Sequence, residues 1–266
     1  TQGVSSAASD VYKRQEYNGL IYKIQSIEQL RDFMNGLGEK SKEMTEQELA
    51  VLCQVAFRDF NKEITNDDDI VYSLDNRLIS GVSDVVCNLQ AAVTGSVVEY
   101  KIKDGTVAIC DNAFNKKGVQ RRRNIYMPNS IVTIGKSAFS QANIQDVVWS
   151  QKLKFIGASA FYGCKLLKTK QGLDLPKSLV YIEAEAFENC CNVLNVVFPD
   201  SIKKIGSYAF KSCDSLEWVY VPDTVMEMGS GVFDECENLK EIRIPKGSRT
   251  KFEKLLPFSV DKFVEV

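Results

Sequence analysis

The chain has 266 residues, of which 44% are hydrophobic and 26% charged, and its formal net charge is −2, as is usual for a soluble globular protein. This charge balance argues against nucleic acid as a partner, and no apolar run approaches the roughly 20 residues that would cross a bilayer. The chain contains no histidine, which excludes Ser-His-Asp and Cys-His catalytic groups and histidine-ligated metals, and we expect neither a cofactor nor a metal.

The first 15 residues lack the features of a folded segment. Residues 1–15 are rich in Ser and Ala, show no hydrophobic periodicity and carry no apolar core such as a signal peptide needs. We expect this segment to be non-native or disordered, and no signal peptide is visible in the chain.

Residues 16–95 are predicted to form a small, mainly helical domain. Ser26 and Thr45 each begin a capping box, and apolar residues at helical spacing follow both of them. The acidic run Asp67–Asp69 lacks the glycine and the distal glutamate of a calcium-binding loop, so we interpret it as the solvated start of a helix. A last helical pattern is predicted between Val82 and Val93.

From about residue 96 to residue 247 the pattern changes to one phrase that recurs six times. The phrase is apolar-x-x-Ile-Gly-x-x-Ala-Phe, then a Cys three residues later, then a short apolar strand that ends in Pro. In the clearest copy, Ile202 to Pro222, the closing proline lies 23 residues from those before and after it. Such a period indicates a solenoid, in which the phenylalanine fills the coil and the glycine allows a tight corner. The phenylalanines are Phe114, Phe139, Phe161, Phe187, Phe210 and Phe233.

The phrase resembles that of the BspA-type leucine-rich repeat family. The matching residues are Ile134-Gly135 with Ala138-Phe139, Ile156-Gly157 with Ala160-Phe161 and Cys164, Ile182 with Ala186-Phe187 and Cys190, Ile205-Gly206 with Ala209-Phe210 and Cys213, and Met228-Gly229 with Val232-Phe233 and Cys236. The resemblance covers about residues 97–247. It implies a leucine-rich-repeat solenoid of about six coils with a short parallel sheet, and so an α+β fold together with the helical region.

Some copies depart from the phrase. The corner glycine is replaced by Cys110 in the first copy and by Glu183 in the fourth, and the third copy carries about three extra residues around 168–172. These departures do not change the predicted fold.

Four of the eight cysteines lie three residues after a repeat phenylalanine. No Cys-x-x-Cys pair occurs, which argues against a structural zinc site. Stacked coils would bring the thiols close enough for disulfides, but their parallel side-chain directions do not suit one. We therefore interpret these cysteines as small buried hydrophobic residues.

A basic run lies in an insertion of the first copy. Arg121–Arg123, together with Lys116 and Lys117, could contact phosphate or an acidic partner. No later copy has a counterpart, and we interpret the run as a solvated loop.

Residues 248–266 are predicted to cap the array. Ser248 to Leu256 has the pattern of a short helix that Pro257 ends, and Phe263 and Val264 are expected in a final edge strand. The end of a repeat array needs such a cover for its apolar surface.

The outward positions of the predicted strands form two columns. Counting back two residues from each closing Pro, or from Ser150, gives the first column, and counting back four gives the second. The first column is Tyr126, Val148, Asp174, Val197, Tyr220 and Arg243, and the second is Asn124, Asp146, Gly172, Asn195, Trp218 and Glu241. Exposed aromatic groups with a polar rim mark recognition sites. The alternatives are that β-propensity alone selected these residues or that the N-terminal domain covers them.

We therefore predict a non-catalytic protein-recognition module with an unidentified protein partner. The resemblance implies a bacterial cell-surface or secreted setting and a role in adhesion, and we expect a monomer. One alternative is a structural spacer that presents the N-terminal domain. The other is an enzyme within residues 16–95 that uses carboxylates on predicted helix surfaces. Those carboxylates are Glu43, Glu46, Glu48, Asp59 and Glu63.

Overall fold

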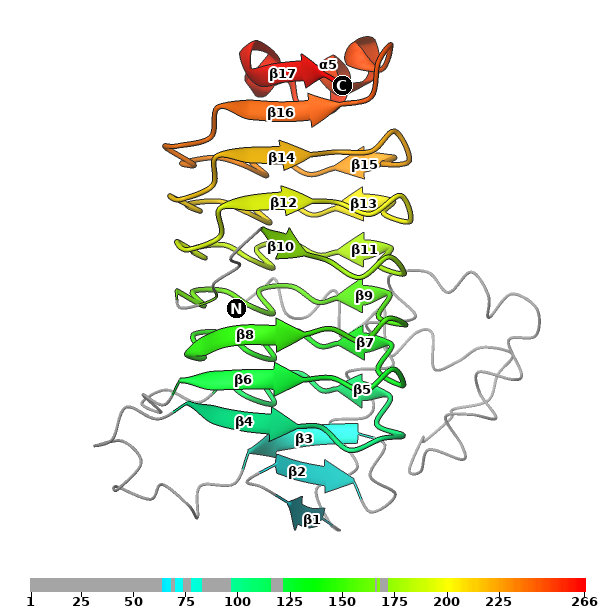
Figure 1. The fold of residues 1–266 in the computed structure, drawn as a ribbon, viewed down its shortest axis with the longest axis vertical. Coiled ribbons are helices and arrows are strands. Elements are labelled where there is room, and N and C mark those ends of the chain that lie inside the picture. The colour runs from blue at the N-terminus through cyan, green and yellow to red at the C-terminus, as the bar shows by residue number, and fades with distance from the viewer. Residues whose placement is uncertain are drawn as a thin grey trace, which may run out of the picture.

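The computed structural model describes residues 64–67, 70–73, 78–82, 97–115, 122–165, 167 and 172–266. From residue 97 onward the chain winds into a solenoid of stacked coils, with strands on two sides (Figure 1). Neighbouring coils share the burial of their apolar residues, as a repeat array requires.

One side of the solenoid is a nine-stranded sheet. Its first three strands pair antiparallel, and every later neighbour in the sheet is parallel. The strands from β5 onward are two residues long and end just before the corner position of the repeat. The strands are β1 (Ile64–Asp67), β2 (Ile70–Ser73), β3 (Leu78–Val82), β5 (Ala108–Ile109), β7 (Thr133–Ile134), β9 (Phe155–Ile156), β11 (Tyr181–Ile182), β13 (Lys204–Ile205) and β15 (Glu227–Met228).

The opposite side carries two separate parallel sheets. The first consists of β4 (Val98–Lys101), β6 (Arg123–Tyr126) and β8 (Ile144–Val148). The second consists of β10 (Leu173–Asp174), β12 (Asn195–Val197), β14 (Trp218–Tyr220), β16 (Glu241–Ile244) and β17 (Phe263–Glu265). Buried residues alternate with more exposed ones along most of these strands, as expected when one face of a strand covers the core.

The row of longer strands is interrupted between β8 and β10, which belong to consecutive coils. Within the described part of the chain, β8 pairs only with β6 and β10 only with β12. On the other side β9 pairs with both β7 and β11, so the coils themselves remain stacked (Figure 1). The break falls at the copy that carries extra residues around 168–172.

The predicted fold needs three corrections. A single short parallel sheet was expected, but the residues before the corner form a second ladder. The α+β class is also wrong for the described residues, which contain many strands and little helix. In the predicted helical domain, Asp67 ends β1 and Val82 ends β3, so neither begins a helix there. The β-branched residues Ile70 and Val71 favour the strand that is found. The capping boxes at Ser26 and Thr45 lie outside the described residues.

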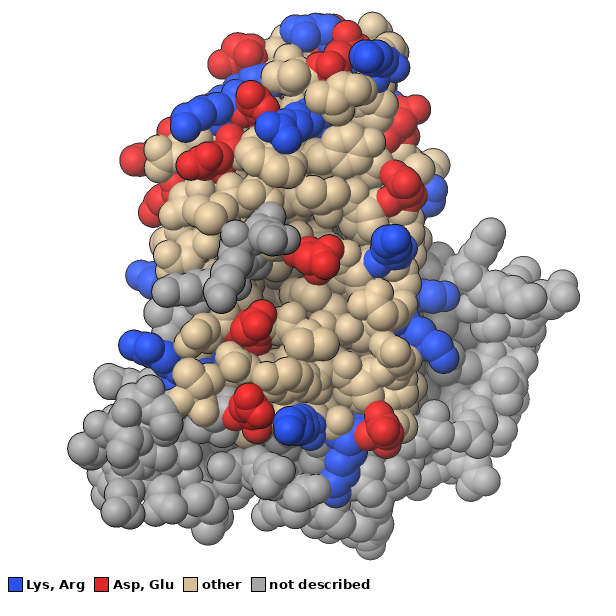
Figure 2. Space-filling model, viewed as in Figure 1, with Lys and Arg blue, Asp and Glu red and all other residues tan. Residues whose placement is uncertain are grey.

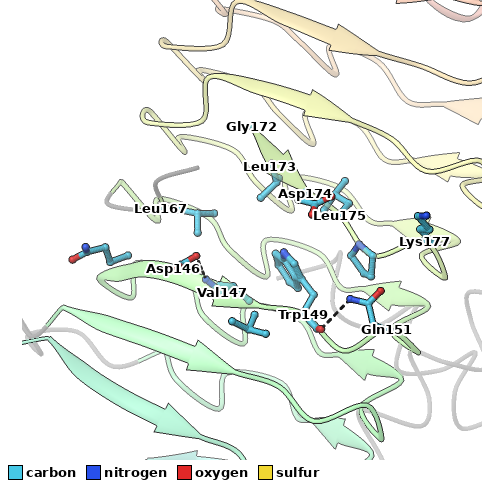
Figure 3. Close-up of a pocket in the computed structure, with 13 residues that line it drawn as sticks. Asp146, Val147, Trp149, Gln151, Leu167, Gly172, Leu173, Asp174, Leu175 and Lys177 are labelled. Carbon is cyan, nitrogen blue, oxygen red and sulfur yellow. Dashed lines mark hydrogen bonds between the residues drawn. The ribbon is translucent and has the colours of Figure 1, made fainter. Parts of the chain in front are cut away.

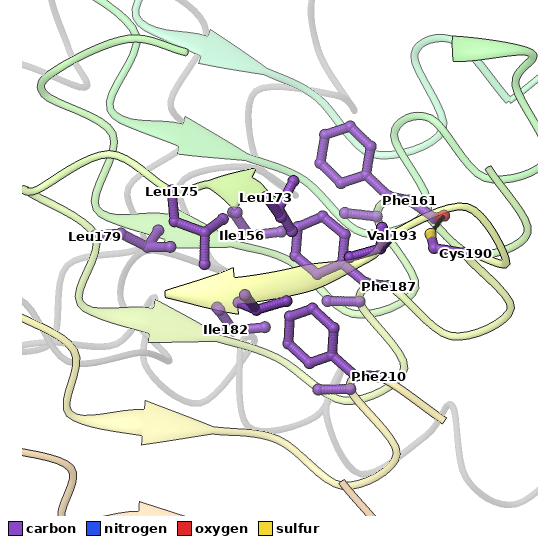
Figure 4. Packing of buried hydrophobic residues seen from close by; sticks show 14 of the residues in the cluster. Ile156, Phe161, Leu173, Leu175, Leu179, Ile182, Phe187, Cys190, Val193 and Phe210 are labelled. Atoms are coloured by element: carbon purple, nitrogen blue, oxygen red, sulfur yellow. Dashed lines mark hydrogen bonds between the residues drawn. The ribbon is translucent and has the colours of Figure 1, made fainter. Parts of the chain in front are cut away.

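The centre of the solenoid is a stack of the repeat phenylalanines. Five of the six are fully buried, and Phe233 at the C-terminal end is 8% exposed. Ring centroids of successive coils lie 4.7 to 5.2 Å apart from Phe114 to Phe210, and the last step to Phe233 widens to 6.2 Å. Figure 4 shows Phe161, Phe187 and Phe210 in this stack, with the aliphatic residues of the strands beside them. The predicted inward position of the phenylalanines is confirmed.

The corner glycines are required by close approach between coils. A Cβ atom at Gly157 would lie 2.7 Å from the backbone of Gly135, and one at Gly206 would overlap the backbone of Glu183 and Ala184. In the described residues, left-handed backbone occurs instead two residues before each phenylalanine and two residues after those from Phe139 onward, for example at Tyr208 (φ 58°). The glycine of the phrase therefore makes room for the preceding coil.

The C-terminal segment covers the last coil. Helix α5 (Arg249–Leu255) is followed by the 3-10 helix η3 (Pro257–Lys262), and β17 adds to the edge of β16. Phe252 is fully buried, and Leu256 and Phe263 are nearly so. In the described residues, no helix has the length and hydropathy of a membrane span.

Candidate binding site on the strand face

Eleven of the twelve predicted outward positions lie on the outer side of the longer strands, which we call the strand face, and Gly172 directly precedes β10. None of the twelve is buried. Within the first sheet, Asn124 aligns with Asp146 and Tyr126 with Val148. The two columns continue in the second sheet, where the first runs through Asp174, Val197, Tyr220 and Arg243, and the second runs through Asn195, Trp218 and Glu241.

The columns do not continue across the break. Because β8 and β10 do not pair, Val148 is not aligned with Asp174, and Asp146 is not aligned with Gly172. Gly172 lies against Asn195, whose side-chain oxygen occupies the space that a Cβ would need. The strand face is therefore divided into a part on β4, β6 and β8 and a part on β10 to β16.

The second part carries an aromatic group at its centre. Trp218 lies under the guanidinium of Arg243, with Cζ 4.0 Å from the ring centroid. Glu241 holds that guanidinium in place, because its Oε2 accepts from Nε and from Nη2 at 2.8 Å each. Tyr220 and Val197 continue this surface, and Val197 is 47% exposed. An aromatic ring, a fixed planar cation and an exposed aliphatic group thus lie side by side.

Charge is sparse in the middle of this side of the molecule. Figure 2 shows uncharged surface over most of the central coils, with acidic and basic side chains gathered toward both ends of the solenoid and along its sides. Single acidic side chains, among them Asp146 and Asp174, are exposed within it. A surface of this kind can bind by apolar contact and hydrogen bonding.

The first part of the face is organised around Tyr126. Its hydroxyl donates to Glu99 on the neighbouring strand, at 3.2 Å. Partial desolvation and this carboxylate raise the pKa of Tyr126, and Asn124 opposes the shift. Val148, 49% exposed, follows Tyr126 in the column.

A cavity of about 590 Å³ opens at the break in the face. Trp149 and Leu173 contribute to its lining, and the carboxylates of Asp146 and Asp174 lie at it (Figure 3). Its volume falls in the range of roughly 300–1,000 Å³ that ligand pockets occupy. The sequence indicated an insertion at this copy but gave no sign of a cavity.

The repeat cysteines form a buried ladder. Each thiol donates to the carbonyl of the phenylalanine in the preceding coil, at 3.1 to 3.3 Å. Burial raises the pKa of Cys236 to about 11 and also raises the pKa of Cys164, Cys190 and Cys213 well above the usual value. None of the six described cysteines forms a disulfide, and Cys53 and Cys87 lie outside the described residues.

Part of the predicted basic loop is not solvated. Arg122 is exposed, but Arg123 begins β6 at an inward position and is 1% exposed. Its guanidinium lies 5.8 Å from the ring centroid of Tyr100, and its Nε and Nη1 have no hydrogen-bond partner within the described part of the chain. The strand alternation that turns Arg123 inward was not visible in the charge run. Lys116, Lys117 and Arg121 lie outside the described residues.

Comparison with known proteins identifies the repeat. Stacked coils with parallel strands and a central phenylalanine stack define a leucine-rich repeat solenoid. The model of the BspA type leucine-rich repeat region, in six copies, matches residues 92–172 and 169–256. The chain belongs to the BspA-type leucine-rich repeat family. No match was found among curated proteins.

Several solved structures are similar to this chain. A leucine-rich repeat protein from Bacteroides ovatus is 28% identical with a TM-score of 0.52, and the match covers 70% of this chain and 46% of that one. A leucine-rich repeat protein from T. pallidum is 24% identical with a TM-score of 0.50, covering 73% and 96%. A leucine-rich cell surface protein from Faecalibacterium prausnitzii is 21% identical with a TM-score of 0.47, covering 68% and 54%. The chain thus spans about half the length of the Bacteroides and Faecalibacterium proteins.

Proposed function

We propose that this chain is a non-catalytic protein-recognition module, placed at a bacterial cell surface or secreted, that binds its partner through the strand face and serves adhesion. The observation that carries the proposal is the in-register group of Trp218, Tyr220 and Val197 on β12 and β14. Trp and Tyr are the residues that most often dominate binding energy at protein interfaces. Membership of the BspA-type family supports the surface setting.

The same group favours recognition over a spacer role. A spacer needs only a solvated outer face, for which charged residues would serve. Here Arg243 and Glu241 are instead engaged in fixing Trp218, and the residues beside them are uncharged. This arrangement stabilises a defined recognition surface before any partner arrives, which lowers the entropic cost of binding.

Site-specific photo-crosslinking tests the proposal. Benzoylphenylalanine is placed at Tyr220 on the strand face, and at Tyr181 of β11 on the opposite side as the matched control. With bacterial surface extract we expect adducts from position 220 alone. Excess unlabelled wild-type protein should abolish them, whereas excess Trp218→Ala protein should not. Equal adducts at both positions, or equal competition by both proteins, would contradict the proposal.

A further inference from the structure

Within the described residues, the break between β8 and β10 leaves one edge of β8 without a strand partner. In the regular coils, the residue before the closing position donates its N–H to the next strand. Met127 donates to Val148 at 2.9 Å, Phe198 to Tyr220 at 3.1 Å, and Val221 to Arg243 at 2.9 Å. In the described residues, the equivalent bond from Trp149 to Asp174 is missing. Leu175, before the next closing proline, donates to Leu173 at 3.1 Å instead of to β12, so in the described residues this bond is missing from both coils that meet at the break.

Two side chains take the place of the missing strand. The carbonyl of Val148 points to β6, so the polar groups of Val147 and Trp149, which alternate with it, point toward β10. The N–H of Val147 donates to Oδ1 of Asp146 at 2.9 Å, and the carbonyl of Trp149 accepts from the side-chain amide of Gln151 at 3.5 Å. The second bond is long and the first closes on the neighbouring residue, so a peptide backbone can replace both.

The cavity beside this edge has an apolar inner wall and an acidic outer rim. Val148, 49% exposed, and the partly accessible Trp149 supply its apolar surface, and Leu167 and Leu173, at most 2% exposed, pack behind it. Asp146 and Asp174 lie at the rim from the two sides and are exposed, and Lys177 lies farther along (Figure 3). An extended strand directs alternate side chains to opposite faces. A strand in this cavity would turn one set onto the apolar wall and the other set between the two carboxylates.

We propose that the cavity between β8 and β10 is a peptide-binding slot, in which an extended segment of a partner protein with alternating apolar and basic residues adds to the free edge of β8. The partner's carbonyl and N–H replace the bonds of Asp146 and Gln151, and Asp146 is released to pair with a basic side chain. Strand addition at an open sheet edge is an established mode of peptide recognition. The slot goes beyond the recognition role of Trp218 and Tyr220 and does not depend on it.

The slot has a built-in fluorescent reporter. The chain has two tryptophans, and the Trp218→Phe variant retains only Trp149, which lines the cavity. We would titrate this variant with a pool of capped five-residue peptides that alternate Lys or Arg with Val, Leu or Phe. A second pool is N-methylated on the backbone, and a third replaces the basic residues by Glu.

A saturable change of Trp149 emission is expected with the basic pool. The N-methylated and acidic pools should bind at least about tenfold more weakly, because each lacks two or more of the hydrogen bonds or ion pairs. Asp146→Asn with Asp174→Asn should weaken the basic pool similarly, since an Asn oxygen can still accept from Val147. Asp200→Asn with Asp214→Asn, which changes two exposed acids outside the slot, is the matched control. Circular dichroism checks the fold of each variant.

Several results would overturn the proposal. They are no response to the basic pool, equal binding of the methylated pool, and no effect of the slot variants beyond the control. A dimer in sedimentation that buries Trp149 would identify a second copy of this chain as the occupant instead. Failure of the slot is distinguishable from failure of the strand-face role, because crosslinking at Tyr220 and the Trp149 titration are separate measurements.

Discussion

At the scale of single residues, the spacing between coils decides which side chains are allowed. Stacked coils bring backbone to within van der Waals contact at the corner, so only glycine leaves enough room at Gly135, Gly157 and Gly206. Most of the positive-φ positions beside the phenylalanines carry other residues, which bear a modest conformational cost, whereas Gly163 and Gly231 avoid it. A glycine at the corner position of the repeat phrase therefore indicates that the backbone of the neighbouring coil lies in close contact with it.

This contact gives the first prediction. Gly206→Ala should lower the free energy of unfolding by about 2–3 kcal/mol, because its Cβ would overlap the backbone of Ala184 in a packed core. Gly247→Ala, at φ 78° with open space around it, should cost only about 1–2 kcal/mol. Urea denaturation of both variants measures the difference. An equal loss of unfolding free energy in the two variants would show that backbone conformation, and not contact with the preceding coil, requires glycine at the corner.

Asp111 makes stability depend on pH. Its Oδ1 accepts from the N–H of Lys136 at 2.7 Å, but desolvation outweighs that bond and Lys136's charge and raises the pKa of the carboxyl above its usual 3.8. A raised folded pKa means that ionisation costs stability as the pH rises above 3.8. Asp111→Asn should therefore raise Tm at pH 7, and the gain should vanish near pH 3.5. Exposed Asp104→Asn is the control, and a gain independent of pH would refute the assignment.

Thiol reactivity separates Cys191 from the ladder. Cys191 is only half-buried, whereas the repeat cysteines are buried and must open before they react. Desolvation and Asp214 raise the pKa of Cys191, so its alkylation should be slow at pH 7 and faster at pH 9. Asp214→Asn should speed the reaction at pH 7. In a chain with Cys53 and Cys87 changed to Ser, mass spectrometry should find Cys191 modified first; early labelling of Cys213 would contradict the ladder.

At the scale of elements, the phenylalanine of each coil links that coil to its neighbours on both sides. Phe187 stacks on Phe161 at 5.2 Å and on Phe210 at 5.1 Å. Phe187→Ala should cost about 3–5 kcal/mol through lost burial and a residual cavity. Phe258, 95% exposed in the C-terminal segment, should tolerate the same change within about 0.5 kcal/mol. Chemical denaturation measures both, and a small effect at Phe187 would mean that the coils do not share one core.

The sequence was most informative where a pattern repeats. Counting back from the closing proline placed residues such as Trp218 and Val197 outward, because a strand has a strict period of two. The second ladder could not be predicted, since two residues such as Lys204–Ile205 are too short to show a period. The solvated position predicted for Arg123 is wrong, because its place in the strand alternation, and not its charge, decides that it lies inward.

The candidate site was predicted only in part for a related reason. The two columns of outward residues follow from the regular length of the coil. Counting back from Ser150 and from Pro176 therefore predicts that Asp146 and Asp174 face outward. Their meeting at one cavity depends on how the extra residues of the third copy displace β10, and a local pattern does not contain that displacement. Irregular copies of a repeat are therefore where sequence reasoning loses the geometry.

At the scale of the whole molecule, the break divides the longer strands into two blocks. A repeat array is stabilised by contacts between neighbouring coils, so a weaker interface lowers the cooperativity of the stack. Between the coils of β8 and β10 the pairing of the longer strands is lost, whereas the ladder through β9, the phenylalanine stack and turn hydrogen bonds such as that from the N–H of Phe139 to Ala160 remain. The two blocks should then open separately under mild denaturation.

Hydrogen exchange tests this division. The amides of Phe198 and Val221 donate to the next strand, whereas Trp149 in the equivalent place has no such bond to Asp174. We expect the amide of Trp149 to exchange at least about tenfold faster, because loss of one bond worth about 1.4 kcal/mol corresponds to that factor. In low urea, the amides of β6 and β8 should exchange together and apart from those of β12 and β14. Uniform exchange across all the longer strands would mean that the solenoid unfolds as one unit. The break would then have no effect on the free energy of opening.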